Sequence, residues 1–65
     1  MRKKLKRLRL EHALTQEEMA KKLGFTRVSY SMIETGKSGG SIRFLKKLKQ
    51  EFPEAVDVDD ILKDE

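Results

Sequence analysis

One short stretch of the sequence gathers residues of mixed chemistry on one side of an expected helix. The stretch is residues 14–36, LTQEEMAKKLGFTRVSYSMIETG, and it contains two helix-start signals eleven residues apart. A helix that begins at Arg27 has one side made of residues 27, 28, 31, 32 and 35. Cationic Arg27 therefore lies beside apolar Val28 and Met32 on a face that needs either a partner or solvent.

The rest of the chain lacks the patterns of common catalytic and metal sites. It contains no Cys and one His, so disulfides and thiolate sites are excluded and a metal centre is not expected. We find no paired carboxylates and no nucleophile with a base. The order of Lys and Ser in GKSGGS, residues 36–41, does not fit a P-loop. We therefore expect a protein that is not an enzyme and that uses no cofactor or metal ion.

Charge is unevenly distributed along the 65 residues. Residues 1–50 hold fourteen Lys or Arg against four Glu, whereas the acidic C-terminal segment, residues 51–65, holds one Lys against seven Asp or Glu. A basic body is typical of proteins that bind polyanions, although short basic chains often carry lysines that merely face water. No apolar run is long enough to span a membrane, and the N-terminus lacks the apolar stretch of a signal peptide. We therefore expect a cytoplasmic protein that does not bind membranes.

Local signals define the two helices of the quoted stretch. The first begins at Gln16, after a Thr-x-x-Glu capping box, and Gly24 supplies the left-handed residue that ends it. The second begins at Arg27, because Thr26 is a good N-cap, and it ends at Gly36. The expected core-facing residues of this pair are Met19, Ala20, Leu23, Phe25, Tyr30 and Ile33.

Three further helices are expected from apolar spacing and caps. The first covers residues 2–12, the fourth begins after Ser41 and ends before Pro53, and a fifth lies around residues 59–63. The apolar residues at core spacing in the first and fourth helices are Met1, Leu5, Leu8, Leu45, Leu48 and Phe52, and the apolar residues of the fifth are Ile61 and Leu62. No stretch alternates convincingly as a strand. The sequence therefore predicts one all-α domain that covers residues 1–65.

The sequence resembles the helix-turn-helix DNA-binding domains of the phage lambda repressor and Cro family. The resemblance runs from Leu5 to Leu62, and it is strongest in LTQEEMAKKLG and in the I-E-x-G-K pattern of residues 33–37. It implies a compact bundle of five helices, with the helix-turn-helix at about residues 16–35. In such domains the helix before the turn lies over the DNA backbone, and the helix after it lies in the major groove.

Residues that match DNA-contacting positions of this family are the candidate site residues. Arg27 can donate two hydrogen bonds to guanine, whereas Val28 and Met32 can make apolar contacts such as those with a thymine methyl group. The side-chain amide of Gln16 matches a phosphate-contacting position at a helix start. The candidate base-contacting residues are Arg27, Val28, Ser31 and Met32. The candidate phosphate-contacting residues are Gln16, Thr26, Thr35, Lys37, Ser38 and Arg43.

Some positions are expected to have a structural role, and for two of the candidates a structural role is an alternative to DNA contact. Arg9 and Glu34 match a family pair that joins the first helix to the third, so we expect both to hold the scaffold. The alternatives for two candidates are that Gln16 is a plain exposed residue and that Met32 is partly buried against the fourth helix. Ala13 stands where the family often has Gly as the left-handed residue at the end of the first helix.

The resemblance implies a repressor-like or Cro-like transcription regulator that reads an operator in double-stranded DNA as a homodimer. We expect a bacterial or prophage protein of the cytoplasm, associated with the nucleoid. One alternative is an antitoxin-type or other regulatory protein partner, which the acidic segment fits, and another is an interaction module that has lost DNA binding. Either a dimer contact or completion of the monomer core accounts for the apolar residues Phe52, Val56, Val58, Ile61 and Leu62.

Overall fold

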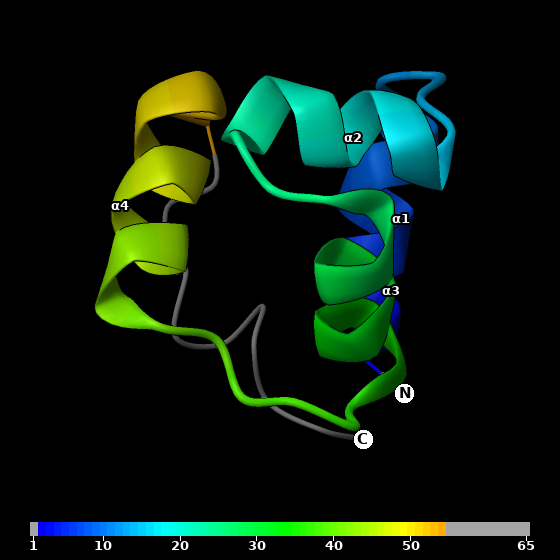
Figure 1. Ribbon diagram of the computed structural model, residues 1–65. Coiled ribbons are helices and arrows are strands. Elements are labelled where there is room, and N and C mark those ends of the chain that lie inside the picture. The colour runs from blue at the N-terminus through cyan, green and yellow to red at the C-terminus, as the bar shows by residue number, and fades with distance from the viewer. Residues whose placement is uncertain (1, 55–65) are drawn as a thin grey trace.

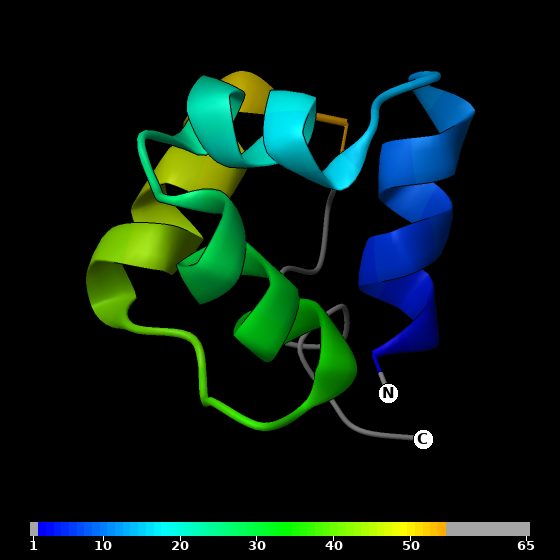
Figure 2. The same cartoon turned by 45° about the vertical axis from the view of Figure 1, so that its right-hand side comes forward.

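The computed structural model describes residues 2–54, which form four helices and no strand. The helices are α1 (Lys3–Glu11), α2 (Gln16–Leu23), α3 (Arg27–Thr35) and α4 (Ile42–Glu51). α2 packs against α3 and α4, and α1 packs against α3. Figure 1 shows α2 across the top with α3 below it and α4 beside one end of it, and Figure 2 shows α1 beside α3. The all-α class is confirmed, whereas the fifth helix expected around residues 59–63 lies outside the described residues.

Three of the helices begin at the predicted residues, each directly after a residue whose side chain caps the helix. The Thr15 hydroxyl oxygen accepts a hydrogen bond from the Glu18 N–H at 3.1 Å, and the Glu18 carboxylate accepts one from the Thr15 N–H at 2.9 Å. This is the predicted capping box of α2. The hydroxyl oxygens of Thr26 and Ser41 cap α3 and α4. The first residue on the outward side of α3 is therefore Arg27, as predicted.

Left-handed residues follow the ends of the first three helices. Gly24 and Gly36 have φ values of 76° and 86°, a region that glycine enters without steric cost. Ala13 has a φ of 55°, although its Cβ makes such a conformation cost roughly 1–2 kcal/mol. The turn is closed by a hydrogen bond of 3.2 Å from the Leu14 N–H to the Arg9 carbonyl. Ala13 thus adopts the conformation that the family often gives to Gly.

The core lies where the inward sides of the four helices meet. Its buried apolar residues are Leu5, Leu8, Met19, Ala20, Leu23, Tyr30, Ile33, Phe44, Leu48 and Phe52. The prediction that Leu45 is the first core residue of α4 was wrong, because Phe44 is fully buried and Leu45 is half-buried. The Phe44 ring lies 5.4 Å from the Phe25 ring and 6.3 Å from the Tyr30 ring, centroid to centroid. These two contacts turn α4 so that Phe44 faces inward.

Phe52 belongs to the core of a single chain. Its side chain is fully buried, and its ring meets the His12 ring edge-on at a centroid distance of 4.7 Å. The His12 Nε2 atom lies 2.7 Å from a carboxylate oxygen of Glu54, so this contact joins the end of α1 to the residues that follow α4. Phe52 is therefore not a dimer contact. The other proposed dimer residues, Val56, Val58, Ile61 and Leu62, lie outside the described residues.

Candidate functional site

The outward side of α3 carries the four candidate base-contacting residues together. The Thr26 hydroxyl accepts a hydrogen bond from the Ser29 N–H at 3.1 Å, which caps the helix directly before Arg27. Val28 is 69% exposed and Met32 is 42% exposed, so both side chains offer apolar surface to a partner. A shallow surface hollow is lined by Arg27, Val28, Ser31 and Met32. The face thus combines one cation, one hydroxyl and two apolar side chains.

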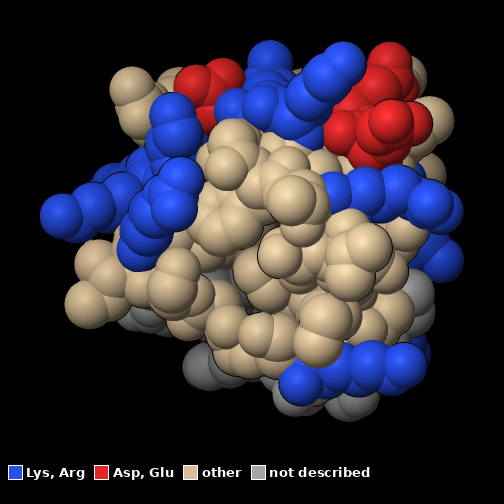
Figure 3. Space-filling model, in the orientation of Figure 1, with Lys and Arg blue, Asp and Glu red and all other residues tan. Residues whose placement is uncertain are grey.

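Positive charge surrounds this face. Figure 3 views the molecule from the side on which α3 lies in front of α1, and it shows an uncharged centre with Lys and Arg on several sides. Acidic residues in that view lie along the top edge, near the start of α2 and near the end of α4. Residues 2–54 contain fourteen Lys or Arg against six Glu. A polyanion that approaches this face therefore meets cations at its edges.

Three candidate phosphate-contacting residues lie at the C-terminal end of α3 and in the loop after it. Lys37 is exposed. Ser38 is half-buried, and its N–H donates to the Met32 carbonyl at 3.0 Å. Thr35 is exposed, but its hydroxyl donates to the Ser31 carbonyl at 2.9 Å, so its single hydrogen is already engaged within the helix. Lys37 is thus the exposed cation at this end of α3.

The other three candidates lie at helix starts. Gln16 is half-buried, and its Nε2 donates to Oε1 of Glu34 at 3.3 Å, so it is not a plain exposed residue. The hydroxyl oxygen of Thr26 caps α3, which leaves its hydrogen to donate outward. Arg43 lies in the first turn of α4 with its guanidinium 5.3 Å from the Phe25 ring centroid, a cation–π geometry.

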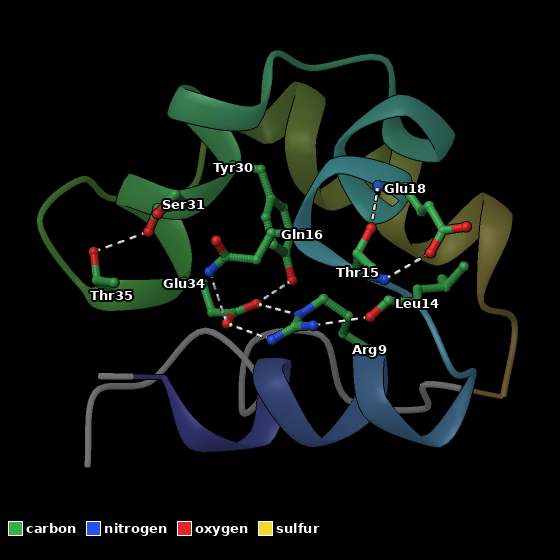
Figure 4. A network of polar contacts seen from close by, with 9 residues as sticks. All are labelled: Arg9, Leu14, Thr15, Gln16, Glu18, Tyr30, Ser31, Glu34 and Thr35. Carbon is green, nitrogen blue, oxygen red and sulfur yellow. Dashed lines mark hydrogen bonds and ion pairs between the residues drawn. The ribbon is translucent and has the colours of Figure 1, made fainter.

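A buried polar network lies behind the outward side of α3 (Figure 4). Arg9 donates from Nε and Nη2 to the Glu34 carboxylate at 3.0 and 3.2 Å, and the Tyr30 hydroxyl donates to the same carboxylate at 2.5 Å. Arg9 also donates from Nη1 to the Leu14 carbonyl at 2.8 Å. Because Gln16 binds the same carboxylate, the network joins α1, α2 and α3. The expected scaffold role of Arg9 and Glu34 is confirmed.

The surroundings of these groups determine their charge. Burial raises the pKa of Glu34, but the hydrogen bonds from Arg9, Tyr30 and Gln16 outweigh burial and hold this pKa below its ordinary value. Burial, followed by the bond to Glu34, raises the pKa of the Tyr30 hydroxyl. The hydrogen bond to Glu34 raises the pKa of Arg9. At neutral pH the network therefore holds a carboxylate, a guanidinium and a neutral phenol.

Sequence reasoning missed Arg2, which the structure places at the end of α3. Arg2 is 7% exposed. Its Nη1 donates to the carbonyl oxygens of Ile33 and Ser38, the latter at 2.7 Å, and its N–H donates to the Glu34 carbonyl at 2.8 Å. The carbonyls that Nη1 binds lie 31 and 36 residues further along the chain. No local pattern therefore distinguishes Arg2 from the lysines that follow it.

Residues 2–54 hold neither a cluster of metal ligands nor a membrane-spanning helix. Within residues 2–54, no group of three or more His, Asp or Glu side chains is placed to hold a metal ion. None of the helices in that range is long and apolar enough to cross a membrane. The outward side of α3 and its surroundings are thus the candidate site in these residues.

Comparisons with known proteins identify the family. The sequence model of the helix-turn-helix family matches residues 5–57, and the chain belongs to this family, of the lambda repressor and Cro type. The chain is 43% identical over 61 residues to an uncharacterised HTH-type transcriptional regulator of Methanocaldococcus jannaschii, covering 94% of this chain and 89% of the relative. No solved structure matches the chain significantly.

Two further relatives carry similar descriptions. An uncharacterised HTH-type transcriptional regulator of Archaeoglobus fulgidus is 36% identical over 52 residues, which cover 80% of this chain and 74% of the relative. The uncharacterised HTH-type transcriptional regulator YqaF of Bacillus subtilis is 48% identical over 48 residues, which cover 74% of this chain and 63% of the relative. Relatives of this chain thus occur in both archaea and bacteria.

Proposed function

We propose that this protein is a DNA-binding transcription regulator that reads an operator in double-stranded DNA with the outward side of α3. One observation carries the proposal: Arg27, Val28, Ser31 and Met32 line one hollow on the outward side of a helix whose start is capped. The major groove of B-DNA admits a helix, and it presents hydrogen-bonding base edges and the thymine methyl group. Membership of the helix-turn-helix family and the descriptions of the relatives support the proposal.

The base-contacting roles follow from the chemistry of each side chain. The guanidinium of Arg27 donates two hydrogen bonds to O6 and N7 of guanine, and Ser31 exchanges one hydrogen bond with a base edge. Val28 and Met32 contact a thymine methyl group. The exposed fractions of Val28 and Met32, 69% and 42%, give both side chains the apolar area for this contact.

The phosphate contacts lie around this helix. Lys37 and Arg43 contact phosphates beyond the two ends of α3, together with the hydroxyl of Thr26. The hydroxyls of Thr35 and Ser38 contact a phosphate oxygen by turning away from the Ser31 and Gly39 carbonyls, to which they donate in the free protein. Gln16 contributes from the start of α2, where free backbone N–H groups favour an anion. Because Glu34 accepts one of the two amide hydrogens of Gln16, the other remains for a phosphate oxygen.

DNA binding is expected to depend strongly on salt, because the proposed phosphate contacts release counterions. Lys37→Ala should weaken binding to all duplexes about equally and should reduce the slope of log affinity against log salt by roughly 0.9. Titrations of one duplex at several salt concentrations measure this slope. Lys3→Ala is the matched control, because it removes an exposed cation from α1. A slope that is flat in the wild-type protein would contradict DNA binding by this face.

We further propose that the regulator binds a symmetric operator as a homodimer, because one α3 covers only half of such a site. Sedimentation at micromolar concentration, with and without an operator duplex, is expected to find two chains on each duplex. Because Phe52 is enclosed within the monomer, Phe52→Leu should alter stability without altering this stoichiometry. A single chain on each duplex would exclude the dimer.

Selection of bound duplexes from a random pool is the experiment that tests the proposed function. We expect enrichment of a short sequence, repeated with two-fold symmetry, that contains a guanine beside a thymine. A repressor or Cro-like role then predicts that the selected site overlaps a promoter. If no sequence is enriched while the folded protein captures a protein partner, the interaction module becomes the better description.

A further inference from the structure

A buried cation lies at the end of α3, apart from the Arg9–Glu34 pair. Arg2 is 7% exposed, and it directly precedes α1. The start of α1 lies near the loop between α3 and α4 (Figures 1 and 2). Its Nη1 donates to the Ser38 carbonyl at 2.7 Å and to the carbonyl of Ile33 in the last turn of α3. A single nitrogen atom therefore binds both the helix and the loop that follows it.

The end of α3 needs donors, because the last four carbonyl groups of a helix have no partners within the helix. The backbone N–H of Arg2 supplies one donor to the Glu34 carbonyl at 2.8 Å, and its guanidinium supplies another to Ile33. The Ser38 N–H supplies a third, to the Met32 carbonyl at 3.0 Å. A cation is also favoured here by the helix dipole. Residue 38 is thus held by its N–H and by its carbonyl.

The loop that Arg2 holds carries two of the residues assigned to phosphates, so this inference rests on the proposed function. We propose that Arg2 is a positioning residue for these contacts: it fixes the backbone around Ser38, so that the Lys37 ammonium and the Ser38 hydroxyl meet the DNA backbone in one arrangement. A loop that is already ordered loses less conformational freedom when it binds. Arg2 acts through the loop, because it is buried and its Nη1 donates to protein carbonyls.

The first test uses the full chain without DNA and follows amide hydrogen exchange by NMR. Arg2→Met keeps an aliphatic side chain but removes the guanidinium, and it is expected to speed exchange of the Ser38 amide about tenfold more than that of the core amides of Leu23 and Leu48. Lys3→Met removes the neighbouring exposed charge and should leave the Ser38 rate unchanged. An unchanged Ser38 rate in folded Arg2→Met would overturn the inference.

The second test is a double-mutant cycle for binding to a selected operator duplex. Arg2→Met and Lys37→Ala are each expected to weaken binding about tenfold, and the double variant little more than either. The reason is that without the Lys37 ammonium there is little left for Arg2 to position. A double variant weakened about a hundredfold would show that the two residues act independently, and it would overturn the inference.

Arg2→Lys separates positioning from charge. It retains the positive charge, but its ammonium is a compact point charge on a shorter side chain than the guanidinium. It should therefore speed Ser38 exchange and weaken DNA binding by more than Lys3→Met does. Wild-type DNA affinity in an Arg2→Lys protein with fast Ser38 exchange would overturn the inference. If Arg2→Met does not fold, Arg2→Lys takes its place in both tests.

The two tests also distinguish failure of this inference from failure of the proposed function. If Lys37→Ala binds every duplex as tightly as the wild type, the proposed phosphate contact of Lys37 is wrong. The positioning role of Arg2, which depends on that contact, is then wrong as well. If Lys37→Ala weakens binding but Arg2→Met behaves like Lys3→Met, the proposed function stands and only the role of Arg2 is overturned.

Discussion

Glu34→Gln is expected to lower the free energy of unfolding by about 3–5 kcal/mol, the usual effect of removing one partner from a buried ion pair. The substitution leaves the guanidinium of Arg9, a residue that is 8% exposed, without its counter-charge. It also places an amide NH₂ group among the side chains of Arg9, Tyr30 and Gln16, all of which donate to the carboxylate in the native protein. Urea unfolding followed by circular dichroism measures the loss.

This loss is large for a domain of this length. At roughly 0.05–0.15 kcal/mol per residue, a domain of this size has a total stability of about 3–10 kcal/mol. Glu17→Gln is the matched control, because it removes an exposed carboxylate from α2, and it should cost at most about 1 kcal/mol. Joint replacement of Arg9 by Met and Glu34 by Leu removes both charges and should recover part of the loss. Equal effects of Glu34→Gln and Glu17→Gln would contradict the role assigned to the network.

The same variant should change how stability depends on pH. The pKa of Glu34 is lowered from its ordinary 4.5, so its charge stabilises the fold above that pH, and this stabilisation is lost as pH falls through the lowered pKa. As the pH is lowered from about 5, the free energy of unfolding should therefore fall less in Glu34→Gln than in the wild-type protein. The pKa values of Glu18 and Glu54 are also lowered, so part of the decrease should remain in the variant.

The ends of the helices could be predicted because their determinants lie within a few residues of one another. The hydroxyl of Thr15, Thr26 or Ser41 caps an N–H group three residues further along. The left-handed residues Gly24 and Gly36 likewise act within one turn. Once the start of α3 was located, the outward side of that helix followed from its periodicity.

The orientation of α4 could not be predicted from periodicity. Phe44 and Leu45 both lie at helical spacing before Leu48 and Phe52, so either choice gives a continuous apolar stripe. The structure selects Phe44 because its ring contacts the Phe25 and Tyr30 rings. Those partners lie 19 and 14 residues earlier in the chain. Contacts at such separation leave no pattern within one segment.

Polar contacts between distant segments were also missed, and they alter the description of the candidate site. Arg2 stands at the start of a basic run and resembles its exposed neighbours in sequence, yet it is buried by its bonds to residues 33 and 38. Gln16 was expected to face a phosphate, but its amide also binds Glu34. The helix to which each residue belongs could be predicted, whereas its hydrogen-bond partners depend on how the helices pack. The DNA itself was suggested by family resemblance rather than by side-chain chemistry alone.

Arg27→Ala is expected to change which duplexes are preferred, with a loss of about 1–3 kcal/mol of discrimination at one base pair. Arg27 is exposed in the first turn of α3, directly after the Thr26 cap, and it borders the hollow shared with Val28 and Met32. From there its fork can reach O6 and N7 of guanine, two acceptors that no other base pair presents in the same arrangement. Alanine removes both donors, so the preference for guanine at that position should weaken.

Arg43→Ala is the matched control for this change, because it removes an exposed arginine from the first turn of another helix. Because Arg43 is assigned a phosphate contact, Arg43→Ala should weaken binding to all duplexes about equally and should reduce the salt slope. Selection from a random duplex pool, after folding is checked by circular dichroism, compares both variants with the wild type. If Arg27→Ala retains the wild-type preference while Arg43→Ala shifts it, α3 is not the helix that reads the bases.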